Sequence, residues 1–349
     1  MLKIKPSYYP LFDWLRGLLA LTVMFYHEGL IGWEPSGDFA VQIFFALSGW
    51  LIGGILIKLE PTELTRFYFN RAIRIWTPYF FALILLITAS LIRESITGKW
   101  IEFIFYKISF VYNIFGAPQR INYFDTMPLD GTGNYFWTVN AEEQFYLLAP
   151  FLLLVNRNTI TRSTIFWIVL AVLANILDIY ASIVFGVLAA VAVNEYGKFY
   201  EKNWVKTLLI FILMLSVFTF TSTSTYSHTS PFAAVSIILL LAVKGQKTKL
   251  GSMVGGMSYP LYLNHWVGLF VAHACLKPFG LRDSFYANIM SLCLNVSLAI
   301  ALYWFMDKKL LAIRNDLYTE KLGKIFTFLA FSTVIIGVIV GLMIKSTRY

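Results

Sequence analysis

The chain has 349 residues, of which 58% are hydrophobic and only 13% are charged. Soluble domains carry about 25% charged residues, so this composition excludes a soluble enzyme and indicates a polytopic membrane protein. The formal net charge of +9 is read as a record of loop topology, and no nucleic-acid partner is expected.

Apolar windows separated by polar, Gly or Pro residues predict an all-α bundle of about ten to eleven membrane helices, forming a single transmembrane domain over residues 1–349. The aromatic run 101–117 is short and contains Lys107, so it is expected to be re-entrant or interfacial. The membrane helices are expected at 10–30, 39–57, 73–92, 136–155, 164–179, 180–194, 204–220, 231–243, 255–276, 285–306 and 325–344.

Lys and Arg concentrate in alternate connecting segments, which places the N-terminus in the cytoplasm by the positive-inside rule. The segment 94–135 is then the longest outer loop, and Thr221–Ser230 is a polar outer loop. The start of the chain does not have the pattern of a cleaved signal peptide. Cys275 and Cys293 lie inside apolar runs, so neither a disulfide framework nor a metal site is expected.

The first apolar run, Leu11–Leu30, carries Asp13, Arg16 and His27 in a segment long enough to span a bilayer. Arg16 and His27 are eleven residues apart, so they share a helix face and lie about 16 Å apart along the axis. Ionisable groups persist in hydrocarbon where they face a partner, a cavity or a ligand. Two residues at opposite helix ends that reach toward water would give the same pattern, so both readings stand at this point.

The second and third predicted helices carry a small-residue cluster and a basic pair. Ser48 and its neighbouring glycines in the second helix favour close helix packing over chemistry. Arg71 and Arg74 lie three residues apart, on one helix face at the inner end of the third helix. Guanidinium groups recognise phosphate through a planar fork of donors, although positive-inside anchors that contact lipid phosphate have the same appearance.

The helix predicted at 136–155 opens with a polar block that contains Glu142 and Glu143. Adjacent helical residues point about 100° apart, so one carboxylate is expected to face a cavity and the other to hold a helix partner. The first predicted helix runs outward and the helix at 136–155 runs inward. His27 and these two glutamates are therefore expected at similar depth, in the outer part of the membrane. A carboxylate beside an imidazole orients it and raises its basicity.

Later in the chain, Asn264 and His265 fall near mid-membrane in the helix predicted at 255–276. A buried histidine is more often structural than catalytic, and that reading is favoured for His265. Asp307 at the end of the next helix is expected to pair with Lys or Arg.

Taken together, six blocks in this order and at this spacing resemble the acyltransferase-3 family of integral membrane enzymes. The resemblance runs from about residue 8 to about 315, and the helix at 325–344 follows it. Three positions depart from the family pattern: Gln42, Asn264 and Asp307. The six blocks are Phe12–Gly17 with His27, Phe44–Ile52, Arg71–Arg74, Trp137–Leu148, Ser258–Trp266 and the end of the helix at 285–306.

The resemblance implies a bacterial O-acyltransferase of the cytoplasmic (inner) membrane. It would move an acyl group, most often acetyl, from cytoplasmic acyl-CoA to a hydroxyl of a surface polysaccharide or glycolipid. Acetyl-CoA is then the expected donor, no metal is expected, and the partners are acyl-CoA, a surface or lipid-linked glycan and membrane lipids. A homo-oligomer is compatible with this reading.

The implied roles follow the family motifs. Arg16, Arg71 and Arg74 would bind the donor, His27 would act as general base, and Glu142 or Glu143 would orient it. A covalent acyl-histidine stays open beside direct transfer. The residues expected to contact the substrates are Trp137, Tyr146, Ser48, Asn264 and His265.

Two alternatives remain at this stage. The same fold could use succinyl-CoA or another acyl donor. A polysaccharide or lipid-linked sugar transporter would also place charges inside the membrane, although the chain shows no internal repeat or paired broken helices of the kind that such transporters carry.

Overall fold

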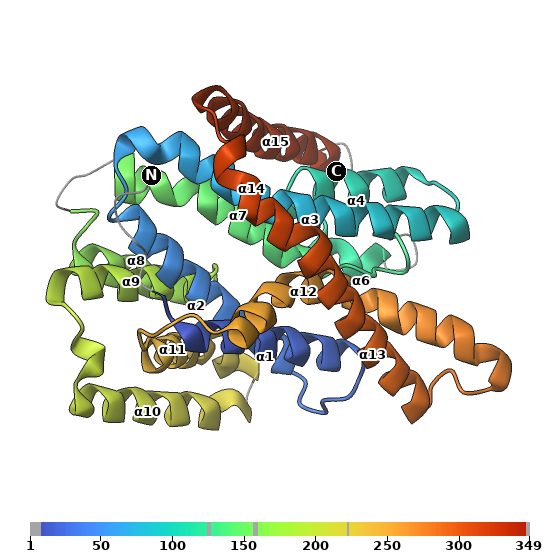
Figure 1. The fold of residues 1–349 in the computed structure, drawn as a ribbon, viewed down its shortest axis with the longest axis horizontal. Coiled ribbons are helices and arrows are strands. Elements are labelled where there is room, and N and C mark those ends of the chain that lie inside the picture. The colour runs from blue at the N-terminus through green and yellow to red at the C-terminus, as the bar shows by residue number, and fades with distance from the viewer. Residues whose placement is uncertain (1–7, 124–126, 156–159, 222, 347–349) are drawn as a thin grey trace. The chain divides into compact units, whose positions relative to one another are not determined.

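The computed structural model describes residues 8–123, 127–155, 160–221 and 223–346. Every regular element in these ranges is a helix, as Figure 1 shows, so the predicted all-α class is confirmed. The apolar helices identify a membrane protein. Four described helical runs are long and apolar enough to cross a bilayer: Ser36–Leu56, Pro61–Arg93, Phe285–Leu317 and Glu320–Ser346.

The chain divides into two compact units, each built from two stretches of sequence. The first unit comprises Met1–Pro61 and Ala149–Tyr262, and the second comprises Thr62–Leu148 and Leu263–Tyr349. The prediction of a single transmembrane domain over 1–349 stays a prediction.

The first unit is organised around the packing of α2 on α9. A Cβ atom at Gly49 would overlap the carbonyl oxygen of Ile183, and one at Gly186 would overlap that of Ala46. Small residues at these positions let the two backbones approach closely, as the sequence indicated for the cluster at Ser48. The helices of this unit are α1 (Pro10–His27), α2 (Ser36–Leu56), α8 (Thr164–Ile176), α9 (Ala181–Tyr196), α10 (Asn203–Phe218), α11 (Thr223–Leu241) and the first half of α12 (Lys249–Leu276).

The second unit contains the polar block of α7 and the long C-terminal helix α15. The run expected to be re-entrant or interfacial forms two short helices, α4 and α5, with a break at Phe110. Figure 1 shows α13 leading directly into α14, through the π-helical turn Tyr303–Asp307. The helices are α3 (Leu64–Arg93), α4 (Gly98–Ile108), α5 (Tyr112–Phe115), α6 (Arg120–Tyr123), α7 (Phe136–Pro150), the second half of α12, α13 (Phe285–Leu302), α14 (Lys308–Leu317) and α15 (Glu320–Ser346).

Several predicted boundaries are wrong, and one of the errors involves a proline. The segment Thr221–Ser230 was expected to be a polar loop, but α11 begins at Thr223 and runs through Pro231. Proline lacks an N–H group, yet neighbouring helices and Ser or Thr side chains compensate for it in membrane helices. Helix α3 begins at Leu64, nine residues before the expected position 73, so Arg71 and Arg74 lie well inside it.

Gly49→Ala is expected to lower the melting temperature of the purified protein in detergent, because the added methyl group meets the α9 backbone and overpacking costs about 1–3 kcal/mol. Gly54→Ala is the matched control, since no atom lies within 4 Å of a Cβ at Gly54. Equal melting temperatures for the two variants would contradict the close α2–α9 contact.

Candidate active site

Helix α1 carries the predicted cation in an ion pair. Arg16 is partly buried, and its Nη1 atom lies 3.2 Å from Oδ1 of Asp13, one helical turn earlier. Asp13 also accepts a hydrogen bond from the hydroxyl of Tyr8, and its side chain lies against Gly255 of α12. The Arg16 charge is therefore partly balanced within the first unit.

His27 is the last residue of α1 and is exposed. The predicted helix extended to Leu30, but Gly29 adopts a φ of 70° and stops it. The N–H groups of Gly29 and Leu30 bond the carbonyls of Tyr26 and Phe25 at 3.1 and 2.8 Å, which is the Schellman arrangement. This arrangement puts the imidazole at the carbonyl end of a helix, where the dipole favours a positive charge.

The predicted basic pair lies on one side of α3. Arg71 is half-buried, with its guanidinium carbon 5.8 Å from the centre of the Phe67 ring, and Arg74 is exposed. Arg74 acts electrostatically on both Asp307 and Arg314. The pairing expected for Asp307 stays a prediction, with Arg74 as the nearby cation.

Glu143 is the buried member of the carboxylate pair, with an exposed fraction of 3%. Its Oε1 atom accepts a 2.9 Å hydrogen bond from the indole Nε1 of Trp76 on α3. Its Oε2 atom is also buried and makes no hydrogen bond to any residue in the described part of the chain. A buried carboxylate with one oxygen held and the other open is a ready acceptor for a proton or a hydroxyl.

Glu142 points elsewhere, as the 100° step between helical neighbours requires. It is partly exposed, and its Oε2 accepts a 3.2 Å hydrogen bond from the hydroxyl of Tyr146, one turn along α7. The sequence predicted unequal environments for the two glutamates but did not decide between them. The structure places Glu143 against a helix partner.

Two further polar residues of α7 were missed by the sequence reasoning. The Asn140 amide accepts from the backbone N–H of Tyr112 at 2.9 Å and donates to the Tyr79 hydroxyl at 3.0 Å. The Gln144 amide donates to the carbonyl of Phe110 at 2.7 Å. Asn140 lies three residues before Glu143 and four before Gln144. This spacing was the available signal, because residues three and four apart share a side of a helix.

The predicted substrate contacts are distributed over both units. Ser48 is half-buried on α2 in the first unit, and Trp137 packs against the aromatic cluster of α4 and α5 in the second. Asn264 and His265 are both buried in α12, where the His265 ring lies 4.4 Å from that of Tyr135. None of these assignments is tested by the geometry, and they stay predictions.

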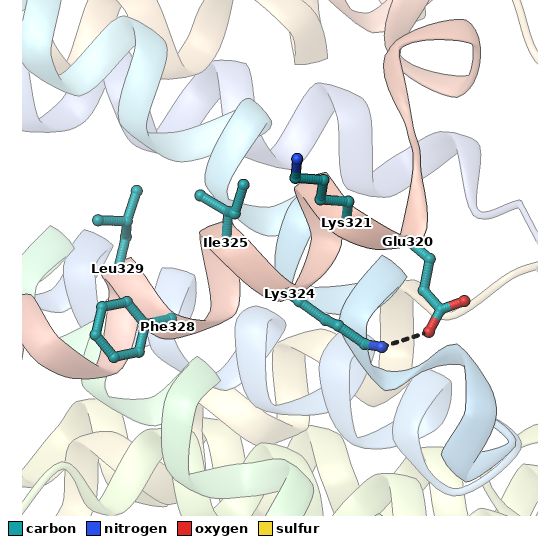
Figure 2. A pocket seen from close by; sticks show the side chains of 6 residues that line it. All are labelled: Glu320, Lys321, Lys324, Ile325, Phe328 and Leu329. Carbon is teal, nitrogen blue, oxygen red and sulfur yellow. Dashed lines mark ion pairs between the residues drawn. The ribbon is translucent and has the colours of Figure 1, made fainter.

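A surface hollow of about 580 Å³ lies along the first turns of α15. Figure 2 shows its six lining side chains, all from α15, with the Lys324 ammonium paired to the Glu320 carboxylate. It contains none of the predicted site residues.

The comparisons with known proteins converge on one family. A family model described as an acyltransferase domain, acyltransferase-3, matches residues 9–306. The peptidoglycan O-acetyltransferase OatA of Listeria monocytogenes is 32% identical over 158 residues, which is 43% of this chain and 25% of that protein. The O-acetyltransferase OatA of Staphylococcus aureus is 28% identical over 151 residues, or 42% of this chain and 25% of that protein. No solved structure matches the chain.

Asn140→Ala is expected to destabilise the protein by about 1–3 kcal/mol, because the backbone N–H of Tyr112 loses its buried acceptor. The measurement is the midpoint of thermal unfolding in detergent. Thr88→Ala is the control, since that exposed hydroxyl bonds only the carbonyl one turn earlier at 2.8 Å. A loss at Asn140 no larger than at Thr88 would show that the amide does not hold α7 in place.

Proposed function

This chain belongs to the acyltransferase-3 family, and on that basis we propose that it transfers an acyl group, acetyl in the simplest case, from acyl-CoA to a hydroxyl of a surface glycan. Both relatives described above have O-acetyltransferase in their names, and one name specifies peptidoglycan. The matched segment spans a quarter of each relative's length. The family membership favours an enzyme over a transporter.

The observation that carries the proposal is His27. An exposed imidazole at the carbonyl end of an apolar helix is accessible to a substrate, and histidine exchanges a proton near neutral pH. The helix dipole stabilises the imidazolium that forms when His27 takes a proton. Arg16, eleven residues earlier on the same helix, adds a cation about 16 Å away, which suits the length of a pantetheine arm.

In the proposed reaction, a ring nitrogen of His27 removes the proton from an acceptor hydroxyl. The hydroxyl oxygen attacks the thioester carbonyl carbon, a new ester C–O bond forms and the C–S bond breaks. The imidazolium returns its proton to the departing thiolate, which leaves as free CoA. Glu143, with one oxygen held by Trp76, is the proposed catalytic carboxylate.

The proposed donor site uses the arginines of α3. Arg71 and Arg74 lie three residues apart on α3. Arg74 lies close enough to Arg314 for the two charges to interact. Clustered guanidinium groups bind phosphates through charge-assisted hydrogen bonds, and CoA carries phosphates at the end opposite its thioester. Acetyl-CoA, entering from the cytoplasm with the inner membrane as the location, is the donor that we propose.

His27→Ala is expected to lower acyl transfer at least about 100-fold, because a general base contributes roughly 10²–10⁴ to the rate. The assay is transfer of radiolabelled acetyl from acetyl-CoA to glycan by purified protein in proteoliposomes. His228→Ala is the matched control, since His228 is another exposed histidine of the first unit, with its Nδ1 atom 2.8 Å from the Asn175 carbonyl oxygen. Activity that survives His27→Ala would remove it from the mechanism.

Replacing Arg71 and Arg74 together by Gln is expected to raise KM for acetyl-CoA about tenfold or more, because each hydrogen bond to a charged group is worth about 1.5–3 kcal/mol. Arg93→Gln, at the other end of α3 where the guanidinium lies over the Phe270 ring, controls for loss of a cation from the same helix. If donor KM is unchanged in the double variant, these arginines serve as lipid anchors.

A further inference from the structure

We propose that α15 is part of the catalytic apparatus, with Phe326 as a positioning residue that holds the indole of Trp76 on Glu143. The inference rests on the proposed function, in which Glu143 is the catalytic carboxylate. It goes beyond the family resemblance, because α15 lies outside the matched residues 9–306.

The orientation of Trp76 decides what Glu143 can do. The 2.9 Å bond from the indole Nε1 to Oε1 fixes the carboxylate and leaves Oε2 open. An indole ring has two side-chain torsions, and its single N–H points at one acceptor only when both are set. Trp76 therefore needs neighbours that hold its ring.

Within the described residues, the rings of Phe110, Phe326 and Phe80 lie against that indole. The Phe110 ring lies 6.0 Å away and nearly parallel, at 27°. The Phe326 ring lies 5.7 Å away at 37°, and the Phe80 ring meets it edge-on at 6.3 Å. Aromatic pairs at these separations attract one another beyond the effect of the area that they bury. Phe326 is the one contact among these three that comes from outside the family match.

The backbone of Phe110, one of these three residues, adopts a strained conformation. Its φ of 56° is in the left-handed region, which is strained for a bulky residue and persists only where surrounding structure determines it. The N–H groups of Phe110 and Val111 bond the carbonyls of Lys107 and Tyr106 at 3.3 and 3.0 Å, which is the Schellman cap that ends α4. The carbonyl of Phe110 also accepts a 2.7 Å hydrogen bond from Gln144, the residue next to Glu143 on α7. Backbone strain of this kind clusters at functional sites.

Phe326 is in turn placed by how α15 packs on α3. Its ring meets Phe69 edge-on at 5.3 Å. One turn earlier, a Cβ at Gly323 would lie 3.1 Å from the Thr65 Cβ, so only glycine allows this approach without a shift. The helix α15 thus presents Phe326 to Trp76, while Phe328, 71% exposed, projects into the hollow of Figure 2.

The kinetic test compares Phe326→Ala with Phe328→Ala, a matched loss of one phenyl ring from the same helix. Phe326→Ala is expected to lower kcat about tenfold with KM for acetyl-CoA unchanged, because a displaced carboxylate affects the chemical step. Phe328→Ala is expected to keep kcat within about twofold. Phe326→Leu, which keeps most of the apolar volume, covers the case in which Phe326→Ala fails to fold, and it should show an intermediate loss of kcat.

A double-mutant cycle shows whether Phe326 acts through the indole. Trp76→Phe keeps a ring and removes the N–H, and its effect should not be enlarged by Phe326→Ala if both act on the same hydrogen bond. Losses that multiply, or a Phe326→Ala variant as active as Phe328→Ala, would overturn the proposal.

A readout without catalysis separates this inference from the proposed function. Protein with ¹⁵N-labelled tryptophan has ten indole N–H groups, and the Trp76 signal is the one missing from Trp76→Phe. The inference expects this signal to move upfield in Phe326→Ala or Phe326→Leu and to stay in place in Phe328→Ala. A Trp76 signal unchanged in the Phe326 variants would overturn it, whatever the activity. Wild-type protein that transfers no acyl group would instead contradict the proposed function alone.

Discussion

A buried carboxylate needs a donor, and the hydrogen bond from Trp76 to Glu143 meets that need in the second unit. An unsatisfied buried polar group costs about 1–3 kcal/mol, and a charged one costs more. Polar side chains on one face of α7 are satisfied in this way. Asn140, Glu143 and Gln144 each form a hydrogen bond with α3 or with the segment between α4 and α5. These three hydrogen bonds tie α7 to its neighbours within the second unit.

In the first unit, the corresponding constraint is the presence of ionisable side chains on the apolar helix α1. Arg16 is paired with Asp13, and His27 lies where α1 ends. Backbone contact between α2 and α9 through Gly49 and Gly186 supplies the rigid frame beside it. The unit thus holds His27, the proposed base, at a helix end.

Much of the helical pattern was predictable, because runs of apolar residues are a strong signal in a membrane chain. The errors arose where local residues were read without their neighbours. Pro231 looked like a boundary, although α11 passes through it. Conversely, Gly29 is a typical residue for the end of a helix, but the hydropathy pattern extended the predicted helix past His27 to Leu30. Gly29 adopts a positive φ in the structure and ends the helix.

The candidate site was predictable only as a set of residues. Helical spacing indicated that Glu142 and Glu143 differ, but which of them is buried depends on Trp76, 67 residues earlier. Nothing in the local sequence of Phe326 or Phe110 marks them as neighbours of that indole. Such contacts between distant residues come from tertiary packing, which propensity and periodicity do not encode.

The most direct test of this account is the initial rate of acetyl transfer by Glu143→Gln beside Glu142→Gln. Gln at position 143 keeps an acceptor for the Trp76 N–H and removes the carboxylate, so folding should be preserved. The account predicts a loss of about 100-fold or more for Glu143→Gln and a change within about threefold for Glu142→Gln, whose carboxylate is partly exposed and accepts a hydrogen bond from Tyr146. Equal losses in the two variants, or full activity in Glu143→Gln, would contradict it.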